Sequence, residues 1–310
     1  MEDLELVIIG AGAAGLAAGI YAVRSGLRTV VLEEKLAGGT AADAPLVENY
    51  PGFLSVTGTE LSQKMVAHAR SAGVTLNELE VVVSLDLMNE MKRVQTQKAV
   101  YEARAVIIAT GSHYRQLDVP GEKEFRGRGV SYCGICDGPF FKGKRVLVVG
   151  GGNSAAMTTL YLSGIAAETK IVHRRGSFRC EEALTKGLMN AKNTEILFNT
   201  EIKEIQGDKV VQKVILLDGK TGETRELAVN GVFIQVGEDP NSQVAKNAGV
   251  MMDQDDYIIV DGQQRTNIEG VYAAGDVTNH PIKQVGTAVG QGITAALEAY
   301  AFIRRPYYKR

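Results

Sequence analysis

The sequence predicts an α/β fold with two dinucleotide-binding domains. Two observations carry this prediction: an apolar run ending in a glycine turn occurs near residue 10 and again near residue 150, and each turn precedes a stretch with helical periodicity. A third observation indicates redox chemistry: Cys133 and Cys136 lie just before the second turn. Two cysteines at this spacing can close a small disulfide. We therefore expect electron transfer between bound dinucleotides and a dithiol.

Composition excludes several classes of protein. The 310 residues suffice for two domains with their own cores, and 45% hydrophobic with 23% charged residues is ordinary for a globular chain. A net charge of −2 provides no basic field for nucleic acid or an anionic membrane, and three cysteines are too few for a disulfide-rich secreted scaffold. The apolar stretch at 4–23 follows acidic residues and is interrupted by glycines, unlike a signal peptide or a membrane span. We expect a cytoplasmic protein without nucleic-acid or membrane partners.

The first glycine turn lies in the context of a dinucleotide-binding fingerprint. A strand is expected at 4–9, a helix at 16–24 and a second strand at 29–32, which ends at Glu33. That acid is placed to accept hydrogen bonds from ribose hydroxyls. The alternative is a tight turn between a strand and a helix, as in any α/β protein.

Three glycines give this turn its expected chemistry. Gly10 allows the tight bend, and Gly12 lets the backbone approach a pyrophosphate at the helix N-terminus. Gly15 brings the helix close to the strand. The turn therefore predicts a bound dinucleotide.

The segment between the first turn and the cysteines is expected to extend the first domain. Residues 38–53 lack periodicity, so they form either a loop over a ligand or a plain surface connection. A helix should follow at 58–72, then a small antiparallel insertion with runs at 81–85, around 94 and around 100, and then a strand at 105–108. The last strand ends in Ala109-Thr110-Gly111, where we expect the backbone to approach a cofactor closely.

The second glycine turn repeats the first. A strand at 144–149 leads into a turn in which Gly150, Gly152 and Ala155 fill the three fingerprint positions, and a helix continues towards residue 163. The chain therefore contains two copies of one nucleotide-binding unit.

The strand that follows this helix ends in bases instead of an acid. Residues 170–172 lead into His173, Arg174 and Arg175, and Arg179 follows. An acid here selects a free ribose hydroxyl, whereas arginines favour a 2′-phosphate through charge-assisted bonds. We therefore predict NADPH as the second nucleotide, with a solvated basic strand end as the alternative.

The rest of the chain should complete both domains. We expect a hairpin around Asp218-Gly219, formed by 210–217 and 224–229, and further strands at 232–236, 257–260 and 270–276. A long last helix should follow at 286–303 and a solvated basic tail at 304–310.

The cysteine pair is the candidate redox centre. Asp137 directly follows Cys136 and can move the proton that opening and closing a disulfide requires. A zinc site is one alternative, but no second cysteine pair and no histidine spacing supplies the remaining ligands. An inert buried pair is the other, because free cysteine often serves as a small hydrophobe. Cys180 has no near partner in the sequence and is expected to be structural.

These motifs together give the chain a close resemblance, over nearly its whole length, to the low-molecular-weight thioredoxin reductases, which are FAD- and NAD(P)-dependent pyridine nucleotide-disulfide oxidoreductases. The likeness is carried by residues 10–15, 109–111, 133–138, 150–155, 173–175 with 179, and 275–276. The resemblance implies Rossmann-like domains of three ββα layers, the second inserted into the first. FAD would bind a discontinuous domain at 1–113 and 243–310, and NADPH a domain at 114–242 that carries the disulfide. A homodimer and a thioredoxin partner are also implied.

Residue roles follow from the resemblance. Cys136 would face the flavin, Cys133 would attack the partner's disulfide, and Asp137 would donate the proton. The FAD contacts would be Gly10, Gly12, Ala13, Ala14, Gly15, Glu33, Gly39, Thr40, Asn49, Val82, Ala109, Thr110, Gly111, Gly275, Asp276, Lys283, Gln284 and Val285. The NADPH contacts would be Gly150, Gly152, Asn153, Ser154, Ala155, His173, Arg174, Arg175, Arg179 and Gly237. No metal site is implied.

The chain departs from the family pattern where it bears on the electron donor. Met157-Thr158-Thr159 occupies a helix where many relatives carry acidic residues, and Thr40 stands where a glutamine usually follows two glycines. Two other readings therefore stay open. One is a flavoprotein reductase with another donor, such as reduced deazaflavin, NADH or ferredoxin, or with another acceptor. The other is a non-enzymatic flavin redox sensor.

Overall fold

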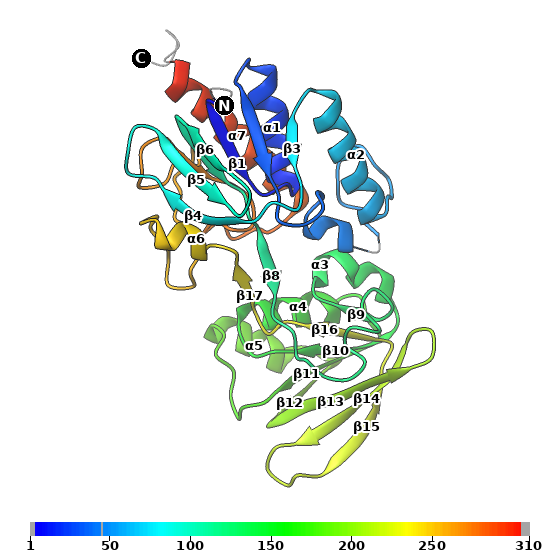
Figure 1. Ribbon diagram of the computed structural model, residues 1–310. Helices are drawn as coiled ribbons and strands as arrows, with labels where there is room; N and C mark the ends of the chain where they lie inside the picture. The colour runs from blue at the N-terminus through cyan, green and yellow to red at the C-terminus, as the bar shows by residue number, and fades with distance from the viewer. Residues whose placement is uncertain (1–3, 45, 305–310) are drawn as a thin grey trace. The chain divides into compact units, whose positions relative to one another are not determined.

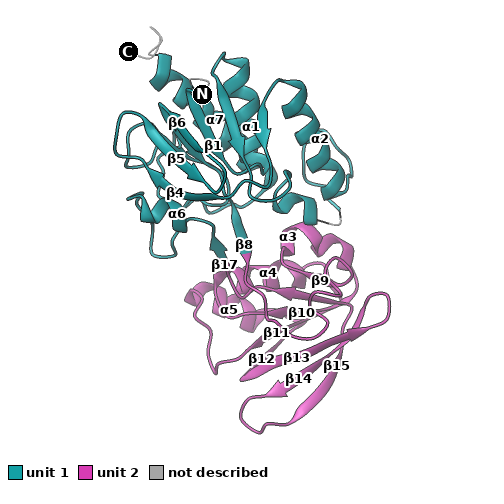
Figure 2. Cartoon of the chain, viewed as in Figure 1, with its two compact units in different colours: residues 1–113, 239–310 teal, residues 114–238 magenta. Residues whose placement is uncertain are grey.

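The computed structural model describes residues 4–44 and 46–304 and divides the chain into two compact units (Figures 1 and 2). The first unit is Met1–His113 with Asp239–Arg310, and the second is Tyr114–Glu238. The chain therefore leaves the first unit and later returns to it. The two crossings lie in β8 (Ser112–Tyr114) and β17 (Glu238–Pro240), which are neighbours in a two-stranded sheet. The chain returns to the first unit between residues 238 and 239, whereas the domain bounds expected from the sequence place the return between residues 242 and 243.

A parallel five-stranded sheet forms the centre of the first unit. Its strand order is β18-β7-β1-β2-β3, and every pair in it is parallel. The strands are β1 (Leu6–Ile9), β2 (Thr29–Leu32), β3 (Thr75–Asn77), β7 (Ala105–Ile108) and β18 (Val271–Ala273). All four residues of β1 are buried, as expected for a strand covered on both faces of its sheet.

Helices cover one face of this sheet and a small antiparallel sheet covers the other (Figure 1). Leu6 and Ile8 pack towards the helices, whereas Val7 and Ile9 pack towards the second sheet. The helices are α1 (Ala13–Arg24), α2 (Gly58–Ser71) and α7 (Val285–Arg304), and the second sheet is β4 (Val82–Asp86), β5 (Lys92–Thr96) and β6 (Val100–Ala103). The short helices η1 (Thr40–Asp43) and α6 (Gln243–Asn247) complete the unit.

The second unit repeats this architecture. Its parallel sheet has the order β12-β11-β10-β16-β9, with β9 (Val130–Ser131), β10 (Arg145–Val149), β11 (Glu168–His173), β12 (Thr194–Phe198) and β16 (Gly231–Ile234). Helices α4 (Asn153–Ser163) and α5 (Glu182–Asn190) pack on one face, and β13 (Thr200–Gly207), β14 (Val211–Asp218) and β15 (Thr224–Ala228) pack on the other. Before β10 the chain forms α3 (Gly134–Asp137) and η2 (Gly138–Phe141). The predicted fold class, with two three-layer Rossmann-like units, is confirmed.

Two expectations at the C-terminal end are wrong. Residues 257–260 do not form a strand; Ile258 makes only isolated bridges, to Met252 and Thr278. Arg304 is not simply solvated, because its guanidinium pairs with the carboxylate of Glu5, whose side chain is only 6% exposed. A nearly buried carboxylate needs such a partner. The remaining tail, 305–310, lies outside the described residues. Among the described helices, none combines the length and the apolar character needed to cross a membrane.

Candidate functional site

The first glycine turn leaves space for a ligand at one position and none at two others. An added Cβ on Gly10 would lie 2.3 Å from the carbonyl oxygen of Ala109, and one on Gly15 would lie 1.8 Å from that of Gly10. Strand, turn and helix are therefore in direct backbone contact. A Cβ on Gly12 would meet nothing closer than the Cα of Gly39 at 3.7 Å. The backbone at the start of α1 is thus open to a diphosphate, whose charge favours a helix N-terminus.

The residues predicted to bind FAD collect at one edge of the first sheet. The glycine turn, Glu33, Ala109-Thr110-Gly111 and Gly275-Asp276 each follow the carboxyl end of a parallel strand, so they share an edge. The Glu33 carboxylate accepts hydrogen bonds from the N–H groups of Ala11 (2.7 Å) and Lys35 (2.9 Å). Its remaining lone pairs can still accept from a ribose.

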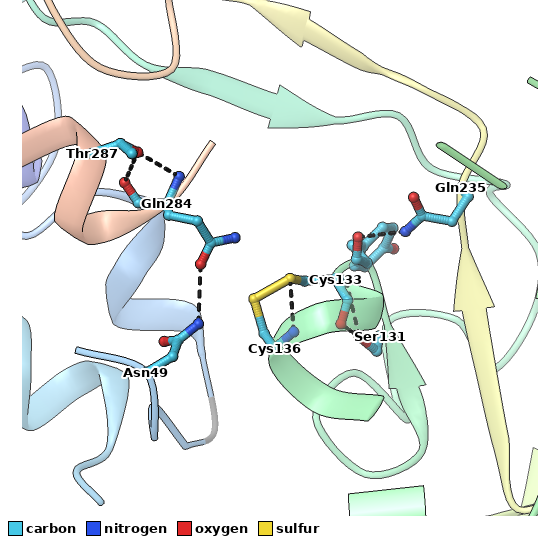
Figure 3. Close-up of a disulfide and its surroundings, with 8 residues drawn as sticks. Asn49, Ser131, Cys133, Cys136, Gln235, Gln284 and Thr287 are labelled. Carbon is cyan, nitrogen blue, oxygen red and sulfur yellow. Dashed lines mark hydrogen bonds between the residues drawn. A yellow bond between two sulfur atoms is a disulfide. The ribbon is translucent and has the colours of Figure 1, made fainter. Parts of the chain in front are cut away.

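The outlying predicted contacts also lie near this edge. Val82 begins β4 two residues after Glu80, whose N–H donates to the carbonyl of Glu33 (2.8 Å). Thr40 begins η1, directly after Gly39. The Asn49 amide donates to Oε1 of Gln284 (3.1 Å), which brings two predicted flavin contacts together (Figure 3).

The ammonium of Lys283 is held by the protein itself. It donates to the carbonyl of Asp276 (3.0 Å) and lies 4.1 Å from the ring centroid of Tyr257. Its contribution to a flavin site therefore includes fixing the backbone around Asp276, and Val285 begins α7 two residues later.

Gln291 is a site residue that the sequence analysis missed. Its Oε1 accepts from the N–H of Gly275 (2.7 Å), and its Nε2 is buried with no hydrogen-bond partner among the described residues. A buried donor without a partner is costly, and an acceptor oxygen of a bound cofactor would satisfy it. The residues present at this edge therefore fit a flavin dinucleotide. The signal in the sequence was a glutamine inside the apolar periodicity of the last helix.

The second glycine turn has the same geometry in the second unit. A Cβ on Gly150 would lie 2.2 Å from the carbonyl oxygen of Gln235, whereas a Cβ on Gly152 would meet nothing within 4 Å. Ala155 is fully buried beneath the turn. The turn, the segment after His173 and Gly237 follow the carboxyl ends of β10, β11 and β16, so they too share an edge. The N-terminus of α4, with Asn153 and Ser154 exposed, is open to a second dinucleotide.

The segment after β11 presents a cluster of free cations. Arg174, Arg175 and Arg179 are exposed, and none forms an ion pair with a carboxylate in the described part of the chain. His173 is buried, and its pKa is lowered by burial and by the three arginines, so the ring is neutral near pH 7. Three unpaired guanidinium groups beside a nucleotide turn suit a phosphate.

The predicted cysteine pair forms a disulfide at the same edge of the same sheet. Cys133 follows β9, and the disulfide joins it to Cys136 across the first turn of α3 (Figure 3). The N–H of Cys136 donates to Sγ of Cys133 (3.2 Å). A Cβ on Gly134 would lie 2.5 Å from Cγ2 of Thr158, so α3 packs directly on α4. The short helix that carries the disulfide therefore packs on the helix that begins at the second glycine turn.

Comparison with known proteins decides the family. The family model described as pyridine nucleotide-disulphide oxidoreductase matches residues 4–292. The chain belongs to the pyridine nucleotide-disulphide oxidoreductases. It is 41% identical over 300 residues to the thioredoxin reductase of Bacillus subtilis, covering 96% of this chain and 94% of that protein. The thioredoxin reductase of Treponema pallidum is 39% identical over 302 residues, with 97% of each chain covered.

A solved structure agrees with the sequence relatives. The crystal structure of thioredoxin reductase from Streptococcus pyogenes superimposes with a TM-score of 0.93 at 38% identity, covering 97% of this chain and 98% of that chain. The resemblance to thioredoxin reductases inferred from the motifs is confirmed. The similarity to thioredoxin reductases thus covers the parts of this oxidoreductase that contain both dinucleotide turns and the disulfide.

Ser131 connects the disulfide of this family member to the predicted proton donor. Its hydroxyl accepts from the N–H of Cys133 (3.0 Å) and lies 3.2 Å from the carbonyl of the same residue (Figure 3). Burial raises the pKa of the half-buried Asp137 carboxyl, and a hydrogen bond from Ser131 opposes part of that rise. Asp137 therefore keeps its proton to a higher pH than an exposed aspartate does.

We expect Asp137→Asn to slow thioredoxin turnover by roughly 10²-fold, the usual contribution of a general acid. A proton donor acts in its protonated form, so if Asp137 has this predicted role, wild-type turnover should fall as pH rises through the raised pKa, and the variant should lack that decline. The check is a pH profile of kcat for both proteins.

Thermal unfolding over the same pH range is the control for this variant. Because the folded-state pKa lies above the unfolded one, the stability that the protonated carboxyl contributes is complete below the unfolded pKa. It is lost as pH rises through the folded value, and the asparagine variant should lack this dependence. Equal pH profiles of kcat for the two proteins would contradict a role for Asp137 in proton transfer.

Proposed function

We propose that the protein is a thioredoxin-disulfide reductase that passes electrons from NADPH, through FAD and the Cys133–Cys136 disulfide, to thioredoxin. The observation that carries this proposal is the disulfide on α3, packed against the helix of a dinucleotide turn, in a chain about 40% identical over its length to thioredoxin reductases. Membership of the family implies a flavin and a pyridine nucleotide.

The first unit is the proposed FAD domain. The open backbone at Gly12, the Glu33 carboxylate and the unpartnered Nε2 of Gln291 support FAD as the flavin. When bound, FAD supplies the chemistry of taking two electrons from a nicotinamide and passing them to a disulfide. The chain's residues would hold the dinucleotide through its phosphates, its ribose and the surroundings of Gln284.

The second unit is the proposed NADPH domain. Gly152 leaves the backbone open to a diphosphate, and Arg174, Arg175 and Arg179 provide positive charge for the 2′-phosphate that distinguishes NADPH from NADH. The absence of an acid at the end of β11 supports the same choice, because the strand ends at His173.

The two cysteines would act in sequence. Two electrons open the disulfide, and Asp137 supplies one proton, so that Sγ of Cys136 becomes a thiol and Sγ of Cys133 a thiolate. Sγ of Cys133, as a thiolate, attacks the disulfide of thioredoxin and forms a mixed disulfide, releasing one thioredoxin sulfur. Sγ of Cys136 returns its proton to Asp137 and, as a thiolate, attacks Sγ of Cys133, which re-forms the internal disulfide and releases the second thioredoxin sulfur as a thiolate that takes its proton from solvent.

The setting of the enzyme also belongs to this proposal. A homodimer follows from the likeness to the family, and a cytoplasmic location follows from the reducing conditions that the use of thioredoxin requires. Cys180, a half-buried thiol 3.2 Å from the Thr185 hydroxyl, is not needed for the reaction.

Anaerobic stopped-flow reduction of the flavin by NADPH, NADH and a reduced deazaflavin tests the donor. We expect rapid bleaching by NADPH and much slower bleaching by NADH, because the arginines favour the 2′-phosphate. Met157, where the resemblance led us to expect an acidic residue, is 53% exposed on α4. Fast reduction by the deazaflavin alone would therefore overturn NADPH as donor and assign the second unit to another electron source.

A further inference from the structure

The arginine segment is tied to the second glycine turn by three hydrogen bonds. The N–H of Arg179 donates to the carbonyl of Gly151 (2.8 Å). The amide of Asn153 then bonds Glu181 at both ends: its Oδ1 accepts from the N–H of Glu181 (2.9 Å), and its Nδ2 donates to Oε1 of the Glu181 carboxylate (3.0 Å). The first residue of α4 and the residue before α5 are thereby held together by side-chain bonds that span 28 positions.

Aromatic rings pack against both the glycine turn and the arginine segment. The ring of His173 occupies the place that a Cβ on Gly151 would take, with three ring atoms 2.3–2.5 Å from that position. The same ring stacks on Phe178 (6.0 Å between centroids), which in turn contacts Phe198 (4.8 Å). The glycine turn and the arginine segment therefore rest on one continuous layer of rings.

The charges in this region are arranged so that the arginines stay available. Glu181 follows Arg179 by two residues, yet within residues 4–44 and 46–304 its carboxylate forms no ion pair with Arg174, Arg175 or Arg179. The amide of Asn153 takes the carboxylate oxygen instead. A free acid at this point would compete with a phosphate for the guanidinium groups.

We propose that Asn153 and Glu181 form a latch that holds the arginine segment at a fixed spacing from the glycine turn and keeps the Glu181 carboxylate away from the arginines. This inference rests on the proposed use of NADPH. It makes Asn153 a positioning residue instead of a direct ligand of the nucleotide. The latch would raise affinity for the 2′-phosphate selectively, because the diphosphate subsite at Gly152 does not depend on where the arginines lie.

Binding of two fragments to the FAD-loaded protein tests the latch. Isothermal titration with 2′,5′-ADP and with 5′-ADP compares ligands that do and do not carry the 2′-phosphate. We expect Asn153→Ala to weaken 2′,5′-ADP about tenfold and 5′-ADP by less than about twofold, because it removes the latch and frees the carboxylate. Glu181→Ala keeps the bond from its backbone N–H to Oδ1 of Asn153 and should lose only part of the same affinity. The double variant should bind 2′,5′-ADP more weakly than Glu181→Ala, because that bond is also lost, and more tightly than Asn153→Ala, because no carboxylate remains to compete.

Glu181→Gln is the matched control. A glutamine Oε1 can still accept from Nδ2 of Asn153, and its backbone N–H is unchanged, so this variant should bind both fragments as the wild type does. Equal losses for 2′,5′-ADP and 5′-ADP in Asn153→Ala would overturn the latch and make Asn153 a ligand of the shared part of the nucleotide. Unchanged affinity for both fragments would overturn it as well.

Amide hydrogen exchange of the nucleotide-free protein separates the latch from the choice of donor. The bond from the Arg179 N–H to Gly151 is not itself removed by Asn153→Ala, so faster exchange of that amide in this variant, but not in Glu181→Gln, is the expected result. Unchanged exchange would overturn the latch even if NADPH is the donor. A wild-type protein that does not prefer 2′,5′-ADP over 5′-ADP would instead refute NADPH, and the specificity role of the latch with it.

Discussion

Replacing Cys136 with serine should abolish thioredoxin reduction while the protein still binds FAD. The internal disulfide cannot form without Cys136, and the proposed route offers no other path for electrons from the flavin to the partner. We expect turnover with NADPH and thioredoxin to fall at least roughly 10³-fold, as it does when a covalent catalytic group is removed. The flavin absorbance and the FAD content should be those of the wild type, because no predicted FAD contact lies on α3.

Cys180→Ser is the matched control for this experiment. It removes the third cysteine, whose sulfur lies 3.2 Å from the Thr185 hydroxyl, and should leave thioredoxin turnover within about twofold of the wild type. Thioredoxin turnover that survives in Cys136→Ser would refute the assignment of the disulfide as the redox centre.

A variant in which Cys133 and Cys136 are both replaced tests the rival functions. A flavoprotein reductase that uses another acceptor would keep its full activity with that acceptor after Cys133 and Cys136 are both replaced, because the electrons would leave directly from the flavin. A protein that only senses redox state through bound FAD would show slow flavin reduction by every donor, in the wild type as in the variant. Loss of turnover confined to thioredoxin separates the proposed enzyme from both.

Buried apolar strands were readable from the sequence, whereas the partly exposed edge strand β3 was not. The strands at Thr29–Leu32 and Ala105–Ile108 were predicted with their observed bounds, because a strand covered on both faces is apolar throughout. The edge strand β3, with sequence Thr-Leu-Asn, has no such pattern and was missed. Its position is determined by pairing with β2, a long-range contact that short sequence windows do not contain.

Helix α5 was missed for a related reason. Only Leu188 of Glu182–Asn190 is buried, and Gly187 interrupts the helical pattern. The structure explains the glycine, because a Cβ there would lie 3.2 Å from a methyl group of Leu160 on α4. The packing of two helices thus selected a residue that, taken alone, argues against a helix.

The candidate site shows the same division between local and long-range information. The glycine turns and the cysteine pair are local motifs, and each could be recognised from spacing alone. Gln291 and Glu181 could not, because each depends on a tertiary contact: Gln291 bonds Gly275, and Glu181 bonds Asn153. Sequence reasoning therefore found the groups that carry the chemistry and missed those that position them.

Two alanine substitutions in the first glycine turn should separate cofactor binding from folding. Gly12→Ala adds a methyl group where the nearest protein atom is 3.7 Å away, at a φ of −78° that alanine adopts freely. The apoprotein should therefore unfold at the wild-type temperature. FAD affinity should fall at least about tenfold, or 1.4 kcal/mol, because the methyl group takes the space that a diphosphate needs.

Gly15→Ala should also lower FAD binding, but here the loss should result from a destabilised fold. Its methyl group would lie 1.8 Å from the carbonyl oxygen of Gly10, a backbone atom that cannot move away without displacing α1 from β1. We expect the free energy of unfolding to fall by about 3 kcal/mol or more, with loss of FAD as a consequence. Thermal unfolding of apo and FAD-loaded protein, with FAD content per chain, provides both readouts.

Gly290→Ala completes the comparison of the two turn variants. This glycine is exposed on α7 with nothing within 4 Å of an added Cβ, so alanine there should be neutral or stabilising by up to about 1 kcal/mol. If Gly12→Ala lowered the unfolding temperature of the apoprotein as much as Gly15→Ala does, the open space at Gly12 would be structural. Wild-type FAD affinity in Gly12→Ala would refute the proposed position of the FAD diphosphate at the N-terminus of α1. Weak FAD binding in an apoprotein of normal stability is the combination that assigns this turn to the cofactor.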